Sequence, residues 1–166
     1  EVYSGPVTYD DRTLLLSVIH DVTARVAVEA ELLESEARLR KAEQVARFGH
    51  WAFVLGEPAM YASAGARRIY GVGDAPATLE QAQDFVVSED RPRLDAALHA
   101  LVNEDAPYDI EFQIRREDTG EIRDIHSIAE FEPETRTVFG VIHDMTERKV
   151  AERELRGLEV LLVRVA

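Results

Sequence analysis

The C-terminal third of the chain alternates between apolar and polar residues in a way that predicts an antiparallel sheet. From Tyr108 to Ile114 every second residue is apolar, which is the pattern of a strand with one buried face. Turn sequences at Asp118-Thr119-Gly120 and Pro133-Glu134-Thr135 end the segments on either side of them. We therefore expect three long strands joined by hairpins. The second and third strands are predicted over 121–131 and 137–143.

Shorter elements precede these strands. Residues 51–55 and Met60-Tyr61 are predicted strands, and 64–70 is a small helix ended by Gly71. Residues 78–87 are helical or irregular. Ser88-Glu89-Asp90 is expected to cap a helix over 91–103, which has leucines on one face. This order predicts an α+β domain, in which a five-stranded antiparallel sheet carries short helices on one face.

Two segments flanking this domain read as amphipathic helices. Residues 22–47 contain no Gly or Pro, and their small and apolar residues recur in steps of four and three, as in a heptad seam. A parallel second copy would bury such a seam, although the stripe could instead pack on its own domain. The seam positions of the first helix are Val28, Leu32, Ser35, Leu39, Ala42 and Ala46. Those of the second are Ala151, Leu155, Leu158, Leu162 and Val165.

A nine-residue sequence occurs twice, and it suggests a domain organisation. Ser17–Arg25 reads SVIHDVTAR and Gly140–Arg148 reads GVIHDMTER, 123 residues later. A repeat at that spacing corresponds to one domain per copy. We expect residues 1–21 to be the C-terminal strands of a preceding domain and 22–47 a connecting helix. Residues 48–145 would then be a complete domain and 146–166 a C-terminal helix.

Composition narrows the classes of function. The 166 residues carry a net charge of −13, which disfavours nucleic acid and anionic membranes as partners. There is no cysteine, so disulfides, thiolate chemistry and cysteine–zinc sites are excluded. No apolar run approaches the ~18 residues of a membrane span. We therefore expect a cytoplasmic protein with no membrane segment in this part of the chain.

Several motifs, taken in order, resemble the PAS domain family. Phe48-Gly49-His50-Trp51 resembles the start of such a domain, and Val87–Arg91 resembles the start of its long helix. Arg68–Gly71 and Pro107–Arg116 resemble the segments after its first helix and along the following strand. Asp144–Arg148 resembles the exit motif, which Asp21–Arg25 repeats. The sequence departs from the pattern at three positions, which are Ala24, Asp124 and Met145.

The resemblance implies a sensory module of a multidomain signalling protein. Some PAS domains hold a cofactor or metabolite between sheet and helices, whereas others are ligand-free dimer spacers. They usually precede a histidine kinase, as in two-component systems, or a diguanylate cyclase. Cysteinyl-flavin photochemistry is excluded because the chain has no cysteine. Haem is not expected, since His99 lies further along its helix than an axial ligand would. No cofactor is required, and any ligand remains unspecified.

The residues also suggest where a ligand and a signal would act. From the exit motif we expect Asp144 to cap the outgoing helix, with Glu147 completing a capping-box pattern. By resemblance, Asp144 would pair with Arg148, and Asp21 with Arg25, to clamp strand to helix. Candidates for signal transmission are Asp21, Thr23, Arg25, Asp144, Thr146, Glu147 and Arg148. Candidates for the cavity wall are Trp51, Phe53, Ile69, Phe85, Leu98, Phe112, Ile114, His126, Ile128, Phe139 and Val141.

No pattern of catalytic or metal-ligating residues is present. The chain lacks a phosphate-binding loop, a nucleophile elbow and kinase or cyclase signatures, and no two histidines have metal-ligand spacing. His50 is expected in a solvated turn, and His20 and His143 have structural roles. The sequence thus favours a dimeric, non-enzymatic sensor that relays a conformational change to an output domain. The alternatives are a ligand-free PAS spacer and a small α+β enzyme using the same cavity.

Overall fold

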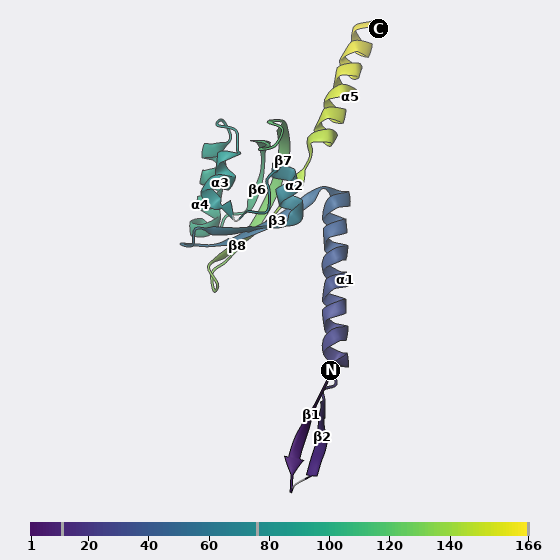
Figure 1. The fold of residues 1–166 in the computed structure, drawn as a ribbon. Coiled ribbons are helices and arrows are strands. Elements are labelled where there is room, and N and C mark those ends of the chain that lie inside the picture. The colour runs from purple at the N-terminus through teal and green to yellow at the C-terminus, as the bar shows by residue number, and fades with distance from the viewer. Residues whose placement is uncertain (11, 76, 166) are drawn as a thin grey trace. The chain divides into compact units, whose positions relative to one another are not determined.

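The computed structural model describes residues 1–10, 12–75 and 77–165, without the side chains of Tyr9 and residues 157–165. They form two compact units, Glu1–Leu39 and Arg40–Ala166 (Figure 1). The first unit contains an antiparallel hairpin of β1 (Val2–Tyr9) and β2 (Arg12–Ile19). It also contains most of helix α1 (Thr23–Ala46), which begins and ends within a residue of its predicted bounds.

The second unit is built on one antiparallel sheet with the strand order β5-β4-β3-β8-β7-β6. The first and last long strands of the unit are therefore neighbours. The sheet has six strands rather than the five predicted, because the two residues of β5 pair with the edge of β4. The strands are β3 (Phe48–Val54), β4 (Ala59–Ala62), β5 (Ala77–Thr78), β6 (Tyr108–Arg115), β7 (Ile122–Glu132) and β8 (Thr137–Asp144).

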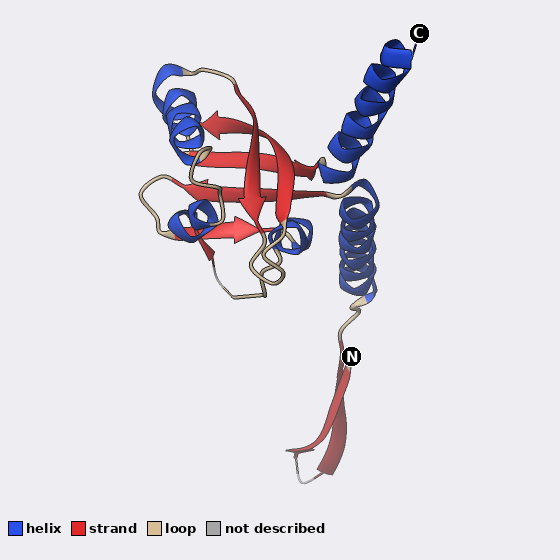
Figure 2. Ribbon diagram, turned by 90° about the horizontal axis from the view of Figure 1, so that it is seen from above, coloured by secondary structure: helices blue, strands red, loops and turns tan. Residues whose placement is uncertain are grey.

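Three helices cover one face of this sheet (Figure 2), as the α+β class predicts. They are α2 (Ala64–Tyr70), α3 (Leu79–Asp84) and α4 (Arg91–Glu104). A fourth helix, α5 (Thr146–Val165), follows β8 directly. Among the described residues, no helix combines the length and apolar character needed to cross a membrane.

Local sequence accounts for the helix ends. The Ser63 hydroxyl accepts from the Ala66 N–H, and Gly71 ends α2 in the left-handed conformation that glycine adopts without strain. Thr78 and Gln81 form a reciprocal capping box on α3. Asp90 differs from its prediction, because its side chain does not cap α4.

The Asp90 carboxylate instead joins α4 to the sheet. It accepts from the Gln113 N–H at 2.7 Å and from Arg93 at 2.8 Å. Burial would raise the pKa of Asp90, but these hydrogen bonds and the Arg93 charge outweigh it and lower the pKa. The residue predicted as a cap therefore stabilises the packing of a helix against β6.

The core lies between the helices and the inward face of the sheet. Ile114, Val138 and Ile142 are fully buried there, in step with the strand alternation. Gly140 lies opposite Trp51 in the β3–β8 register, and a Cβ built on it would lie 2.3 Å from the indole ring. Only glycine leaves room for the indole at this position.

The hairpin of the first unit has no comparable core. All of β2 is exposed, and its most exposed apolar residues are Leu15 at 74% and Ile19 at 73%. Two strands cannot bury a core by themselves. The hairpin therefore presents an apolar surface that nothing in the described structure covers.

Candidate functional site

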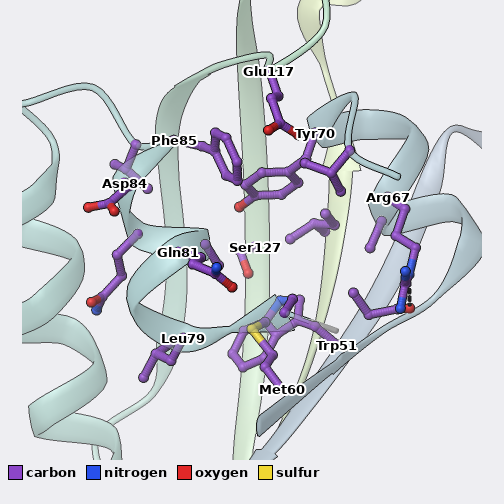
Figure 3. Close-up of a pocket in the computed structure, with 18 of the residues that line it drawn as sticks. Trp51, Met60, Arg67, Tyr70, Leu79, Gln81, Asp84, Phe85, Glu117 and Ser127 are labelled. Carbon is purple, nitrogen blue, oxygen red and sulfur yellow. Dashed lines mark hydrogen bonds between the residues drawn. The ribbon is translucent and has the colours of Figure 1, made fainter. Parts of the chain in front are cut away.

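The second unit contains a partly open cavity of about 410 Å³ between the sheet and its covering helices (Figure 3). This volume is in the range of small-molecule sites. The wall is mostly apolar and aromatic, and it draws on β3, β4, β6, β7 and β8 as well as α2, α3 and α4. Its larger apolar residues are Trp51, Met60, Tyr70, Leu79, Phe85, Leu94, Leu98, Tyr108 and Phe112.

The predicted cavity residues divide into three groups. Four of them line the cavity, namely Trp51, Phe85, Leu98 and Phe112. Three belong to the buried core but not to the cavity wall, namely Phe53, Ile69 and Ile114. Four lie on the opposite face of the sheet, and their assignment to the cavity is corrected here. These are His126, Ile128, Phe139 and Val141.

The error on β7 and β8 has a physical cause. At the middle of these strands the inward positions carry small residues, Ser127, Ala129 and Gly140, beneath the indole of Trp51 and the cavity. The bulky residues fall between them and point outward. His126 accordingly lies 2.6 Å from Asp109 on the outer face, and hydrophobicity alone selected the wrong face.

Sequence reasoning missed several cavity residues that the strand period could have found. Tyr108 lies on the same face of β6 as Phe112, because the two are separated by two periods of the strand alternation, and both line the cavity. Burial raises the pKa of Tyr108 to about 12, against a smaller lowering by the Ser127 hydroxyl. Burial also raises the pKa of Tyr70, whose ring meets Phe85 edge to face. Both phenols are therefore neutral at pH 7.

Within the second unit, Glu43 fastens the last turns of α1 to β3 and α2. Its carboxylate lies 2.9 Å from His50 Nδ1 and accepts from the Gly65 N–H at 3.0 Å. His50 is thus half-buried within β3, packed beside Tyr61 and Phe139, rather than in a solvated turn. His20, His99 and His143 are exposed. The described residues contain no group of three His, Asp or Glu arranged to hold a metal ion.

The junction between β8 and α5 is a network of short hydrogen bonds. Asp144 Oδ1 accepts from the Thr146 N–H at 3.0 Å, as an N-terminal cap does. The Thr146 hydroxyl donates to the same oxygen and accepts from the Asp124 N–H at 2.9 Å. The Asp124 carbonyl accepts from the Met145 N–H. At the repeated position, Asp21 accepts from the Thr23 N–H at 2.9 Å.

The predicted clamp between Asp144 and Arg148 is wrong, and so is its counterpart at Asp21. Arg148 lies 3.5 Å from Glu152 and Arg25 lies 3.8 Å from Glu29, because i,i+4 partners share an exposed helix face. Asp144 faces Arg123 at 3.6 Å instead.

Glu147 does not complete the predicted capping box with Asp144, because its carboxylate pairs with Arg47 just after α1. This ion pair raises the pKa of the Arg47 guanidinium.

The carboxylate that holds α5 is Asp124 on β7, which is only 7% exposed. It accepts from Arg153 at 2.9 Å and from Gln113 at 3.0 Å, with Lys149 at 3.8 Å. Lys149 also donates to Glu111 at 2.6 Å and lowers the pKa of Glu111. We call Asp124, Lys149 and Arg153 the α5 anchor. In the sequence, the one sign of a special role for Asp124 was that this position departs from the family pattern.

The residues that hold the base of α5, Asp124 of the anchor and the capping Asp144, lie on two strands that also line the cavity. On β7, Ser127 lines the cavity three residues after Asp124. On β8, Ile142 lines the cavity two residues before Asp144. A displacement of either strand in the cavity wall would therefore act at the base of α5.

The predicted seam residues that the structure describes are exposed. These are Val28, Leu32, Ser35, Leu39, Ala42, Ala46, Ala151 and Leu155. Leu158 and Leu162 lie outside the residues whose side chains are described.

Solved structures with the same fold include parts of a histidine kinase and of a diguanylate cyclase. A sensory box histidine kinase/response regulator from Burkholderia thailandensis is 29% identical, with a TM-score of 0.60 over 76% of this chain and 98% of its own. The N-terminal domain of a diguanylate cyclase with PAS/PAC sensor from Marinobacter aquaeolei is 12% identical, with a TM-score of 0.53, over 61% and 98% of the two chains. A PAS domain from Colwellia psychrerythraea is 17% identical, with a TM-score of 0.52, over 70% and 98%. The last two share the fold alone.

Comparison with curated proteins gives no match. The family model described as PAS fold matches residues 59–142, about half of the chain. That range runs from β4 to the cavity residue Ile142 on β8, so it contains most of the sheet and all three covering helices. The curved antiparallel sheet and the cavity beneath its helices are thus those of a sensor fold, and the chain belongs to the PAS family.

Proposed function

We propose that this PAS domain is a non-enzymatic signal relay, in which the state of the cavity sets the position of α5. The observation that carries the proposal is that β7 and β8 line the cavity and also hold α5, through the α5 anchor on β7 and the Asp144 cap on β8. The cavity is not filled by side chains, which favours a ligand-responsive sensor over a ligand-free spacer. A histidine kinase or diguanylate cyclase type of output domain in the same protein would receive the signal.

The relay is completed by a parallel homodimer. Val28, Leu32 and Leu39 are largely exposed on α1, at the heptad positions of the predicted seam. A second copy of the chain supplies the matching surface, because identical helices in parallel place equal heptad positions opposite one another. Rotation or repacking of this coiled coil would carry the change in α5 to the output domain.

We also propose that residues 1–21 are the final strands of a preceding PAS-like domain. The repeat aligns Leu15 with Val138 and Ile19 with Ile142. Val138 and Ile142 are 0% and 1% exposed, whereas Leu15 and Ile19 are the most exposed apolar residues of β2. The missing strands and helices of such a domain would cover this face of the hairpin.

Spin labelling tests the relay, since a chain without cysteine accepts single cysteines cleanly. Spin labels at Glu130→Cys on the outer sheet face and Glu154→Cys on α5 report the distance between the sheet and the helix. Excess unlabelled chain is added so that only the distance within one chain is measured. Ala82→Phe fills the cavity from α3, and we expect it to shift the distance by about 2 Å. Glu80→Phe, on the exposed side of α3, should not.

Adding Asp124→Asn should abolish the response to Ala82→Phe. An unchanged distance in a folded Ala82→Phe variant would contradict the relay.

A further inference from the structure

Tyr70 and Trp51 each carry a polar hydrogen in the cavity wall that has no acceptor among the described residues. The Tyr70 hydroxyl and the Trp51 indole N–H both belong to lining residues. Neither group is hydrogen-bonded within the described structure, and each still has accessible surface. Figure 3 shows the hydroxyl and the indole nitrogen directed into the same space. A ligand that displaces water from this part of the cavity must offer these donors an acceptor, because leaving them unpaired would weaken its binding.

Several other polar side chains of the wall are hydrogen-bonded within the protein. The Arg67 guanidinium donates to the carbonyls of Ala62, Gly73 and Ala75. The Ser127 hydroxyl donates to the Val141 carbonyl. Gln81 completes the cap of α3, Gln83 bonds Asp95, and Asp84 accepts from Arg91. The Gln81 amide nitrogen and the Glu117 carboxylate also line the cavity without a partner in the described structure, but both residues are exposed. The less exposed part of the wall therefore offers a ligand the Tyr70 and Trp51 donors and no free cation.

Charge excludes an acidic ligand. Asp84 and Glu117 contribute carboxylates to the lining, with Glu117 exposed beside Tyr70 (Figure 3). The one lining guanidinium, Arg67, is saturated by carbonyls, and the chain carries −13 overall. An anion entering this cavity would lose its hydration without gaining a cation.

The shape of the wall favours a flat apolar molecule. Trp51 lies on one side, stacked against Phe53, and the Tyr70–Phe85 pair lies on the other. Aromatic walls hold planar ligands by stacking and edge contacts. From these observations we propose that the cavity binds a neutral, planar aromatic compound whose carbonyl accepts hydrogen bonds from Tyr70 and Trp51. This inference rests on the proposed function and names the ligand class of that site.

Four probes with one ring system test the class. They are 2-acetonaphthone, 2-ethylnaphthalene, 2-naphthoate and 2-naphthylmethylamine, and binding is measured by calorimetry. We expect the ketone to bind tightest. Because Trp51 is the single tryptophan, its indole N–H gives one NMR cross-peak, and only the ketone should move it downfield as expected of a hydrogen bond.

The matched variants are Tyr70→Phe, which removes one hydroxyl, and Tyr61→Phe, which does the same on the exposed outer face. Tyr70→Phe should weaken ketone binding about three- to tenfold and leave ethylnaphthalene binding unchanged. Tyr61→Phe should change neither.

Tighter binding of the hydrocarbon, amine or carboxylate would overturn the ligand class, as would failure of all four probes. The Ala82→Phe experiment tests the relay without any ligand. Failure of the probes to bind would therefore not change the outcome of that test of the proposed function.

Discussion

Gly140 shows at the scale of one residue how the sheet accommodates its tryptophan. A Cβ at this position would lie 2.3 Å from the Trp51 ring, so either the indole or β8 must shift. We expect Gly140→Ala to lower the free energy of unfolding by about 1–3 kcal/mol, measured by urea denaturation. Gly73→Ala is the control, because nothing lies within 4 Å of its Cβ. Equal effects would contradict this account.

Asp90 should make stability depend on acid pH. Its pKa is lowered in the folded protein from the ordinary 3.8, so the unfolded chain binds the proton more readily. The stabilisation is present above the unfolded pKa and is lost as pH falls through the folded value. Urea unfolding at several pH values between 7 and 3 should show a shallower acid loss for Asp90→Asn than for the unmodified chain. Parallel curves would mean that Asp90 does not contribute.

At the scale of elements, the α5 anchor determines how firmly a helix is held on the sheet. Asp124→Ala removes the acceptor of Arg153 and Gln113. We expect a loss of about 1–3 kcal/mol in unfolding free energy and faster hydrogen exchange over residues 146–153. Glu121→Ala, which removes an exposed partner of Arg123, should change stability by less than about 0.5 kcal/mol. Unchanged exchange in Asp124→Ala would exclude the anchor.

The hairpin proposal can be tested by transplanting a strand. Residues 14–21 replace 137–144, with Ser17 changed to glycine because that position faces Trp51. We expect a folded domain with a cooperative thermal transition, since Leu15 and Ile19 would take the buried places of Val138 and Ile142. The same insert shifted by one residue reverses every side chain and should not fold. Failure of the in-register insert would argue against the hairpin being a PAS strand pair.

At the scale of the whole molecule, substitutions at two adjacent leucines can test the predicted dimer seam of α1. Leu32 is a seam position and Leu33 is not, yet both are largely exposed on α1. Leu32→Asp should shift the mass measured by light scattering from dimer towards monomer, because it places like charges opposite each other in the seam. Leu33→Asp should leave the dimer intact. Identical masses for the two variants would exclude the proposed register.

The sequence by itself determined what depends on local pattern. Strand alternation, turn residues and caps placed the long strands and the small helix ended by Gly71, and the ordered motifs identified the family. The α+β class followed, because these properties act over a few residues. The predictions for Asp90 and for the Asp144–Arg148 clamp failed because each of these polar side chains had several possible partners within reach, and local sequence does not select among them.

Tertiary structure decided which partner and which face each residue took. Ser127 and Gly140 point inward because the cavity and Trp51 require small residues there, so the bulkier Ile128 and Phe139 point outward. Asp124 holds α5 because β7 runs beside the start of that helix, which no local pattern records. The cavity, with the Tyr70 and Trp51 donors in its wall, likewise arises only when strands and helices distant in sequence surround one space.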